Sequence, residues 1–597
     1  MAYDYAIVHL KYTIPQACLL TLISKPLLTK LDLYKTFTLI FIAFFATLPW
    51  DSYLVRHGIW TYPPDAITGL RLFSIPAEEL FFFVIQTYIT SILYTLLNKT
   101  ILHAQFLTNK NDSTTKSRWI KILGQIFLIG CIAAGAFLVK RGGKGTYLGL
   151  ILIWASPFVF FTWSLSGYFI LKLPLINVAI PIIVPTVYLW IVDEIALGRG
   201  TWAIESGTKL GCRVWGSLEL EEAIFFLVTN VLIVFGMAAF DRGLAVLYTF
   251  PNVFPDVPSL PPPGLMAKAV LADPAEYDMS RVKGIRQAVK TLQQKSRSFY
   301  LASSAFPGRL RIDLVLLYSF CRVADDLVDE SSTQAGAFLW SSNLSKYLDL
   351  VYPSDGQSPS THNASLYVEQ NFPEEAKPAL ELLPVKLLPS QPFCELLQGF
   401  KTDLDFKWTY PEKGNIRFPI KNEADLELYA QRVASSVGEL CLRLVFHYSE
   451  TELSSDKKSI LVVAARTMGH ALQYVNIARD IAVDADMGRV YLPSNWLKEE
   501  IITPEDILRD PNQPKVEKLR QRLLDLAFKE YERSREVMSL LPHEVRAPMI
   551  IAVESYMEIG RVLRERKRAI PQVKKGRATV PLLRRLWVAW RTLLAEK

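Results

Sequence analysis

The chain has 597 residues, of which half are hydrophobic, and its formal net charge is +8 at pH 7. Apolar residues dominate the first 240 or so positions, whereas the sequence from about residue 270 onward has the charge density of a soluble enzyme. No recognised nucleic-acid-binding module accompanies the positive charge, which argues against nucleic acid as a partner. The six cysteines are scattered without a CxxC pair, which argues against a disulfide framework and against a zinc site.

Seven apolar runs of spanning length occupy the N-terminal part. They lie near residues 5–24, 36–50, 78–97, 119–139, 146–170, 174–192 and 221–240. The proline-rich segment Pro251 to Gly264 cannot continue a helix and predicts a stiff linker. From about residue 280 apolar residues recur at helical spacing. We therefore predict an all-α protein with a membrane domain over 1–245, a linker over 246–275 and a soluble helical domain over 276–597.

The membrane domain contains an internal repeat. Asp51 is followed by Trp60, and Asp193 is followed by Trp202 at the same spacing of nine positions. A Glu-Glu pair then begins the next apolar run, 27 residues after the first aspartate and 28 after the second. Matching offsets of three residue types favour a duplicated three-helix unit over a chance likeness in composition. The additional span at 119–139 gives both units the same orientation, so the two sets of polar residues can face one pocket.

Ionisable groups at membrane depth are costly, so repeated carboxylates there indicate a function. For one residue of each pair a structural role stays open, because acidic side chains suit the first turn of a helix. A carboxyl group among aromatic residues can protonate a carbon–carbon double bond, and a neighbouring carboxylate with the faces of Trp60, Trp202 or Tyr62 can stabilise the carbocation. This pattern predicts a redox-neutral cyclisation without a dinucleotide. The catalytic candidates are Glu78, Glu79, Glu221, Glu222, Asp51 and Asp193.

Residues 1–240 resemble the membrane-embedded lycopene cyclase family, whose two halves carry this Asp, Trp and Glu-Glu pattern. The resemblance implies that β-rings are formed at the ends of lycopene or related linear carotenes. It identifies no cofactor for this domain.

Two acidic stripes characterise the soluble part. On helices, two sets of residues would each share one face: Tyr318, Arg322, Asp325 and Asp329, and Gln473, Asn476, Asp480 and Asp484. Stacked carboxylates repel each other, and Mg²⁺ relieves this repulsion while favouring a few carboxylates plus phosphate oxygens. Two facing stripes therefore predict a site where a metal-held diphosphate departs and leaves an allylic cation. Arg322, Arg479 and Arg489 can neutralise the departing charge, and a solvated acidic face is the alternative for either stripe alone.

From about residue 285 the chain resembles phytoene synthase within the squalene/phytoene synthase family. The matching segments are KSRSFYLA from Lys295, CRVADDLVDE from Cys321, YAQRVASSVG from Tyr429, and the block from Asn476 to Pro493. The resemblance implies an all-α prenyl-synthase bundle that uses Mg²⁺ or Mn²⁺ and joins two geranylgeranyl diphosphates to give phytoene. The substrate-binding residues it implies are Ser298, Tyr318, Arg322, Tyr429, Gln473, Arg479 and Arg489, and the metal ligands are Asp325, Asp329, Asn476, Asp480 and Asp484.

The order of the two resemblances is that of the fungal bifunctional lycopene cyclase/phytoene synthase family. The expected partners are geranylgeranyl diphosphate, lycopene and related linear carotenes, the lipid bilayer and a carotene desaturase. The expected location is the endoplasmic reticulum or another endomembrane, with the C-terminal domain in the cytosol. Two alternatives stay open: a squalene-synthase-like enzyme, and a seven-helix receptor, transporter or anchor fused to such an enzyme.

Overall fold

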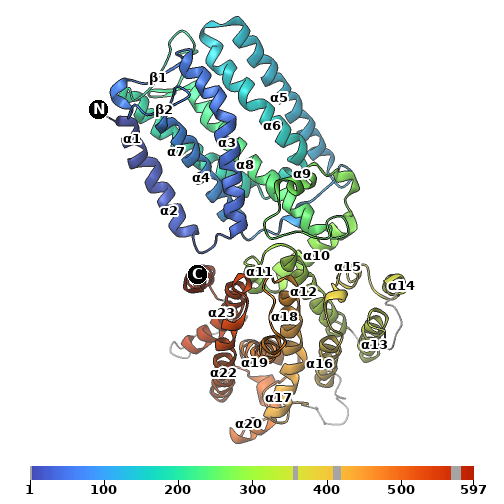
Figure 1. Cartoon of the computed structure of the whole chain (residues 1–597). Helices are drawn as coiled ribbons and strands as arrows, with labels where there is room; N and C mark the ends of the chain where they lie inside the picture. The colour runs from blue at the N-terminus through green and yellow to red at the C-terminus, as the bar shows by residue number, and fades with distance from the viewer. Residues whose placement is uncertain (1–2, 332, 354–360, 408–417, 567–579, 597) are drawn as a thin grey trace. The chain divides into compact units, whose positions relative to one another are not determined.

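The structure, a computed structural model, describes residues 3–331, 333–353, 361–407, 418–566 and 580–596. These residues form helices almost throughout, and their strands are limited to three short two-stranded pairs. The chain divides into two compact units, Met1–Val282 and Lys283–Lys597 (Figure 1). The predicted all-α class is confirmed.

Seven helices of the N-terminal unit are long and apolar enough to cross a membrane, which confirms the predicted number of spans. The first is a continuous run of α1 (Asp4–Val8), η1 (His9–Thr13) and α2 (Ile14–Ser24). The others are α3 (Lys30–Arg56), α4 (Ala77–Asn98), α5 (Thr115–Arg141), α6 (Thr146–Lys172), α7 (Leu175–Arg199) and α8 (Leu220–Thr249). Several helices are longer than the predicted apolar runs because polar residues continue them at their ends, as in the first and last turns of α3.

Strand pairing shows how the two halves of this unit are related. Strand β1 (Trp60–Thr61) pairs antiparallel with β4 (Ala203–Ile204), which places Thr61 opposite Ala203. These two residues are 142 positions apart, the spacing that also separates Trp60 from Trp202. Equivalent residues pair directly only where a two-fold axis passes between them. The first run, α3 and α4 therefore correspond to α6, α7 and α8, and α5 is the linking span.

Two hairpins repeat the same relationship immediately before α4 and α8. Strands β2 (Arg71–Leu72) and β3 (Ile75–Pro76) form one hairpin, and β5 (Arg213–Trp215) and β6 (Leu218–Glu219) form the other. Each hairpin ends where the next helix begins, and the first turn of that helix carries a Glu-Glu pair.

The segment predicted as a linker is partly folded onto the N-terminal unit. Helix α9 (Pro263–Leu271) packs on α8 at Gly243, where an added Cβ would meet the side chains of Val270 and Met266 at 2.8 and 2.9 Å. The Arg242 guanidinium donates to the Val270 carbonyl at 2.6 Å. These contacts extend the unit beyond the proline-rich segment to Val282.

The C-terminal unit is a bundle around one apolar core, and the central helix α19 contacts α18, α22 and α23 (Figure 1). A π-helical turn, η8 (Gln431–Ser435), lies against α19. The helices that follow the boundary-crossing α10 (Met279–Lys295) are α11 (Arg297–Ser303), α12 (Gly308–Asp329), α13 (Gln334–Val351), α14 (Thr361–Asn371), α15 (Lys377–Glu381), α16 (Gln391–Lys407), α17 (Glu423–Ala430), α18 (Ser436–Tyr448), α19 (Ser455–Asp486), α20 (Ser494–Glu499), α21 (Pro504–Arg509), α22 (Pro514–Arg535), α23 (His543–Arg566) and α24 (Leu582–Glu596).

Candidate active sites

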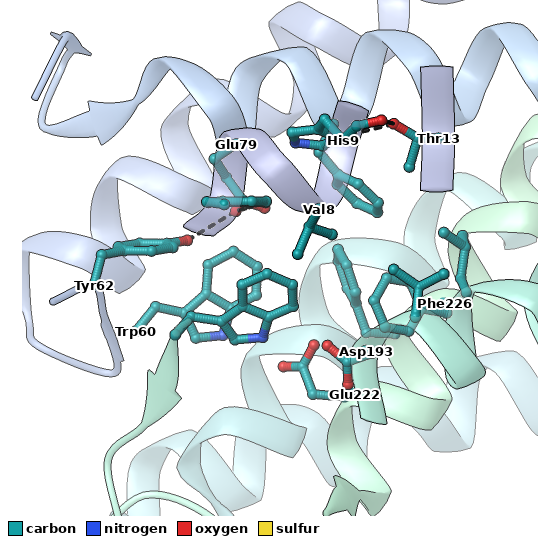
Figure 2. Close-up of a pocket in the computed structure, with 15 residues that line it drawn as sticks. Val8, His9, Thr13, Trp60, Tyr62, Glu79, Asp193, Glu222 and Phe226 are labelled. Carbon is teal, nitrogen blue, oxygen red and sulfur yellow. Dashed lines mark hydrogen bonds between the residues drawn. The ribbon is translucent and has the colours of Figure 1, made fainter. Parts of the chain in front are cut away.

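One cavity in the N-terminal unit is lined by residues from both repeats (Figure 2). Figure 2 shows Glu79 on one side of a group of aromatic side chains and Asp193 with Glu222 on the other. Among the described residues that line this cavity, His9 is the only one that can carry a positive charge. The full lining is Tyr5, Val8, His9, Thr13, Trp60, Tyr62, Glu79, Phe82, Leu189, Val192, Asp193, Trp202, Glu222, Phe225 and Phe226.

Each repeat holds its cavity glutamate with a tyrosine from its own first helix. The Tyr5 hydroxyl donates to Glu79 at 2.5 Å, and the Tyr62 hydroxyl adds a second bond at 2.9 Å. In the other half the Tyr147 hydroxyl donates to Glu222 at 2.6 Å. Tyr5 and Tyr147 are also 142 positions apart, so they are counterparts. The sequence analysis missed both, although extending the repeat offset to the first helices would have found them.

The first glutamate of each pair has a different place from the second. The Glu78 carboxylate accepts the backbone N–H of Thr68 at 2.7 Å, and the Glu221 carboxylate accepts the backbone N–H of Leu210 at 2.6 Å. Neither glutamate lines the cavity. These bonds tie the preceding loop to the first turn of α4 or α8. Glu78 and Glu221 therefore contribute to the local fold, and Glu79 and Glu222 are the glutamates whose side chains reach the cavity.

The two predicted aspartates also differ from each other. Asp193 lines the cavity, where it lies beside Glu222 (Figure 2). Asp51 is fully buried outside the lining, close enough to Glu79 for an electrostatic interaction. Among the described residues, neither oxygen of the Asp51 carboxylate has a hydrogen-bond partner, whereas the Asp193 carboxylate interacts with Trp202. Leaving a buried polar group unpaired is costly, so Asp51 carries a stability cost.

The first helix widens by one π-helical turn, η1, where it passes the cavity. The residues at its two ends, His9 and Thr13, both belong to the lining. The His9 ring bridges the Glu78 carbonyl oxygen at 3.1 Å and the Thr13 hydroxyl at 3.0 Å. Single π turns are frequent at functional sites, and this one was not visible in the sequence.

A second cavity adjoins the first and shares Thr13, Phe82 and Leu189 with it. It runs between the first helix, α4 and α7, and its additional lining residues are Gln16, Ile85, Gln86, Ile89, Thr90, Pro185 and Tyr188. The two cavities together extend the site from the carboxylates along the apolar helices α4 and α7.

In the other half two tryptophans pack against Phe225, a residue of the first cavity. Trp50 stacks on Trp154 with ring centroids 4.7 Å apart and on Phe225 at 5.5 Å. By the repeat offset the counterpart of Trp50 is Val192, a much smaller residue. The two-fold symmetry of the carboxylates is therefore broken in the space around them.

In the C-terminal unit α12 and α19 carry the two predicted stripes, and Arg489 joins them. This arginine follows the end of α19 and donates to both carboxylate oxygens of Asp329 on α12, at 2.7 and 3.1 Å. On α12 Arg322 pairs with Asp325 at 3.0 Å. On α19 Arg479 pairs with the buried Asp480 at 2.6 Å.

Asp403 on α16 is a further acidic residue at this site, and the sequence analysis missed it. It accepts the hydroxyl of Tyr491 at 2.6 Å and that of Tyr429 at 3.3 Å. Burial raises the pKa of the Asp403 carboxyl to about 6, against the opposing effect of Arg489. A single aspartate on a helix gives no stripe, so no sequence signal indicated it. Tyr429, which is predicted to contact substrate, donates its bond to Asp403 from α17.

The other predicted residues lie as follows. Asn476 accepts the Tyr556 hydroxyl at 3.0 Å, and Tyr318 stacks on Phe299 with ring centroids 5.3 Å apart. Asp484 interacts electrostatically with Tyr491, and Gln473 is half-buried on α19. Ser298 lies in α11, and its side chain is outside those described.

The acidic residues of this site suit a divalent cation that is shared with a ligand. Burial, followed by the charge of Asp329, raises the pKa of the Asp325 carboxyl to about 7. A cation between these carboxylates would relieve that repulsion. Among the described residues no group of three or more His, Cys, Asp or Glu could hold a metal ion by itself. Mg²⁺ typically takes one or two carboxylates from the protein and completes its shell with water and phosphate. Acidic residues that repel each other without forming a larger ligand group are therefore compatible with a Mg²⁺ ion that is shared with a phosphate.

Two family models match the chain, Lycopene cyclase over residues 5–97 and Squalene/phytoene synthase over residues 292–584. The chain is 56% identical to a bifunctional lycopene cyclase/phytoene synthase of Colletotrichum graminicola, with all of both chains covered. A protein of the same name from Podospora anserina is 52% identical with the same coverage. A solved dehydrosqualene synthase structure is 26% identical, with a TM-score of 0.40, and covers 52% of this chain and 96% of its own. The full-length identities show that the chain belongs to the bifunctional lycopene cyclase/phytoene synthase family.

Proposed function

We propose that the C-terminal unit condenses two geranylgeranyl diphosphates to phytoene and that the N-terminal unit closes β-rings on lycopene, giving γ-carotene and β-carotene. The observation that carries the second assignment is the cavity in which Glu79 and Glu222 from the two repeats face one apolar space. Full-length relatives named for both activities favour this assignment over a squalene synthase with a membrane anchor. Phytoene must be dehydrogenated before it becomes lycopene, so a desaturase acts between the two reactions.

In the cyclase, a carboxyl group shielded from water by aromatic residues acts as the proton donor. Glu79 or Glu222 donates its proton to the terminal double bond of the carotene, and the neighbouring double bond attacks the resulting cation to form the ring bond. A proton then leaves to a carboxylate, so that no net oxidation occurs. Tyr5 and Tyr147 orient the two glutamates, and the faces of Trp60 and Phe225 stabilise positive charge between them.

The second cavity is proposed to hold the polyene chain while its end lies between the glutamates. It is apolar along Ile85 and Ile89 and adjoins the first cavity at Thr13, Phe82 and Leu189. In the other half the stacked Trp50 and Trp154 are proposed to close the corresponding path. One end of the carotene is therefore cyclised at a time, and a second ring requires the molecule to re-enter in the opposite direction.

In the synthase, Mg²⁺ or Mn²⁺ would be held by Asp325 and Asp329 on α12 and by Asn476, Asp480 and Asp484 on α19, where the bound metal supplies charge neutralisation to the leaving diphosphate. Arg322, Arg479 and Arg489 now pair with these acids. When the acids take a metal, the guanidinium groups become free to bind phosphate oxygens. The Tyr429–Asp403–Tyr491 group fixes the position of Asp403 beside the stripes.

We further propose that the protein lies in the endoplasmic reticulum or another endomembrane with its C-terminal unit in the cytosol, where diphosphate substrates are made. Seven spans then place the loop between α7 and α8 on the lumenal side and the loop between α4 and α5 on the cytosolic side.

The glutamate assignment predicts a difference within each pair. Glu79→Gln and Glu222→Gln should each lower ring formation by about 100-fold or more, because an amide cannot act as the acid. Glu78→Gln and Glu221→Gln keep an oxygen that accepts the loop N–H, so they should retain cyclisation. The measurement is carotenoid analysis in cells that supply lycopene, with phytoene yield from the same chain as the internal folding control. Equal loss in all four variants would reject the distinction.

If the carotene enters through the second cavity, a bulky side chain should inhibit cyclisation only when it is placed in that half of the unit. Ile89→Trp should reduce lycopene cyclisation about tenfold or more, the rate equivalent of about 1.4 kcal/mol. Leu232→Trp, at the equivalent position of the other repeat, should have little effect. Phytoene synthesis should persist in both variants. Equal inhibition by the two tryptophans would show that both halves admit substrate.

For the synthase, Asp329→Asn and Asp480→Asn should each reduce metal affinity by at least about 10- to 100-fold, because loss of even a partner of a metal ligand has an effect of that size. Phytoene formation by purified protein should then require much higher Mg²⁺, while cyclisation of supplied lycopene continues. The test is a Mg²⁺ titration of both activities. Normal phytoene yield at limiting Mg²⁺ would contradict the proposed ligand set.

The orientation can be tested by glycosylation. Ser206→Asn creates the acceptor Asn-Gly-Thr with Gly207 and Thr208 in an exposed loop between α7 and α8, and it should become glycosylated if that loop is lumenal. The natural acceptor at Asn111, between α4 and α5, serves as the matched control and should stay unmodified. A glycan on Asn111, detected as a mass shift sensitive to endoglycosidase, would reverse the orientation.

A further inference from the structure

The last helix of the C-terminal unit, α24 (Leu582–Glu596), turns its charged face toward the protein. The Arg584 guanidinium donates to Glu558 on α23 at 2.5 Å and to both oxygens of Glu565 at 2.6 and 2.7 Å. Near the other end of the helix Glu596 accepts from Arg535 of α22 at 2.9 Å. The polar side of α24 is therefore anchored to the bundle by ion pairs.

The apolar face of α24 points away from the protein. Its large exposed side chains are Leu582, Leu583, Leu586, Trp587 and Leu594. Leu583 is 80% exposed and Trp587 is 58% exposed, and Trp587 stacks on Trp590 one turn along the same face. A helix of a soluble bundle normally buries such a face against its core. Here that face needs an occupant from outside the unit.

We propose that this face of α24 inserts into the headgroup region of an anionic bilayer. The same chain carries seven spans, so a bilayer is always within reach of the C-terminal unit. Leucine and tryptophan are the side chains that interfacial helices insert, and tryptophan favours the boundary between acyl chains and headgroups. Arg591 is exposed at one edge of the apolar face, and Arg585, with Arg297 close by, borders the other edge. These cations match anionic lipid headgroups.

The charge and length of the helix disfavour other arrangements. Two copies packed through this face would bring the arginines at its edges together, and like charges repel. Its 15 residues span about 22 Å, which is shorter than the hydrocarbon core of about 30 Å, so α24 cannot cross the bilayer. An orientation parallel to the membrane surface satisfies both constraints.

The consequence concerns substrate and product transfer. Polyprenyl tails and phytoene are both apolar, and a unit held flat on the bilayer exchanges them without passing them through water. Loss of the contact should slow phytoene synthesis on vesicles more than synthesis in detergent. This inference does not depend on the assignment of the cyclase residues.

The contact can be tested with a fluorescent label on the full-length chain in lipid vesicles. Leu586→Cys places the label on the apolar face, and Ala595→Cys places it away from that face, at an exposed position near the end of the same helix, as a control. The background would have its six native cysteines replaced and its phytoene synthesis verified. Lipids with bromine atoms on the acyl chains should quench the label at position 586 several-fold more than the label at position 595. Anionic vesicles should give stronger quenching than zwitterionic ones.

A charged residue on the apolar face gives an independent measurement. The quantity measured is the ratio of phytoene synthesis in detergent to phytoene synthesis on anionic vesicles. Trp587→Glu should raise this ratio because it slows synthesis on vesicles, and Ala595→Glu should leave the ratio unchanged. Equal quenching at the two label positions would overturn the proposal. A label at position 586 that is shielded from water, is not quenched by brominated lipid and becomes more shielded as the protein concentration rises would also overturn it. That result would identify a second copy of the chain as the occupant of the face.

Discussion

The N-terminal unit depends on burying two carboxylic acids so that both face the same apolar space. An unpaired carboxylate is expensive in such surroundings, and each glutamate is held by a tyrosine hydroxyl from its own repeat: Tyr5 for Glu79 and Tyr147 for Glu222. The two-fold relation between the repeats brings the two pairs together. Pairing of β1 with β4 lies on the axis and joins the halves at their centre. The bonds from Glu78 and Glu221 to the preceding loops then fix where each following helix begins.

Differences between the two repeats make the surroundings of the two glutamates unequal. The carboxylates are equivalent, but the side chains around them are not, because Trp50 stacks on Trp154 in one half and its counterpart in the other half is the much smaller Val192. The π-helical turn η1 belongs to the open half and places His9 and Thr13 in the wall. This arrangement fits a long carotene whose ends are processed in turn.

Electrostatic balance organises the C-terminal unit in a different way. Its acids are stabilised by arginines, and Arg489 links Asp329 on α12 to the segment after α19. Asp403, held by Tyr429 and Tyr491, adds a further carboxyl that raises the pKa of Asp325. Under the proposed function, the arginines that balance these acids would bind phosphate when cations take their place. The fold and the charge distribution are therefore suited to a ligand that carries its own negative charge and arrives with metal ions.

Much of this arrangement was readable from the sequence because it depends on local periodicity. Apolar length predicts the seven candidate spans, helical spacing predicts the two acidic stripes, and constant offsets reveal the duplication. Only the tertiary structure could decide which glutamate of each pair faces the cavity, because adjacent residues on a helix point about 100° apart and a sequence does not show which direction is inward. The sequence did not predict Asp403 or the π-helical turn as parts of a site, because the residues that each contacts there are distant in the chain. The fold was also needed to show that the apolar face of α24 points outward. Amphipathic spacing predicts a polar and an apolar face, but it does not show which of them the protein covers.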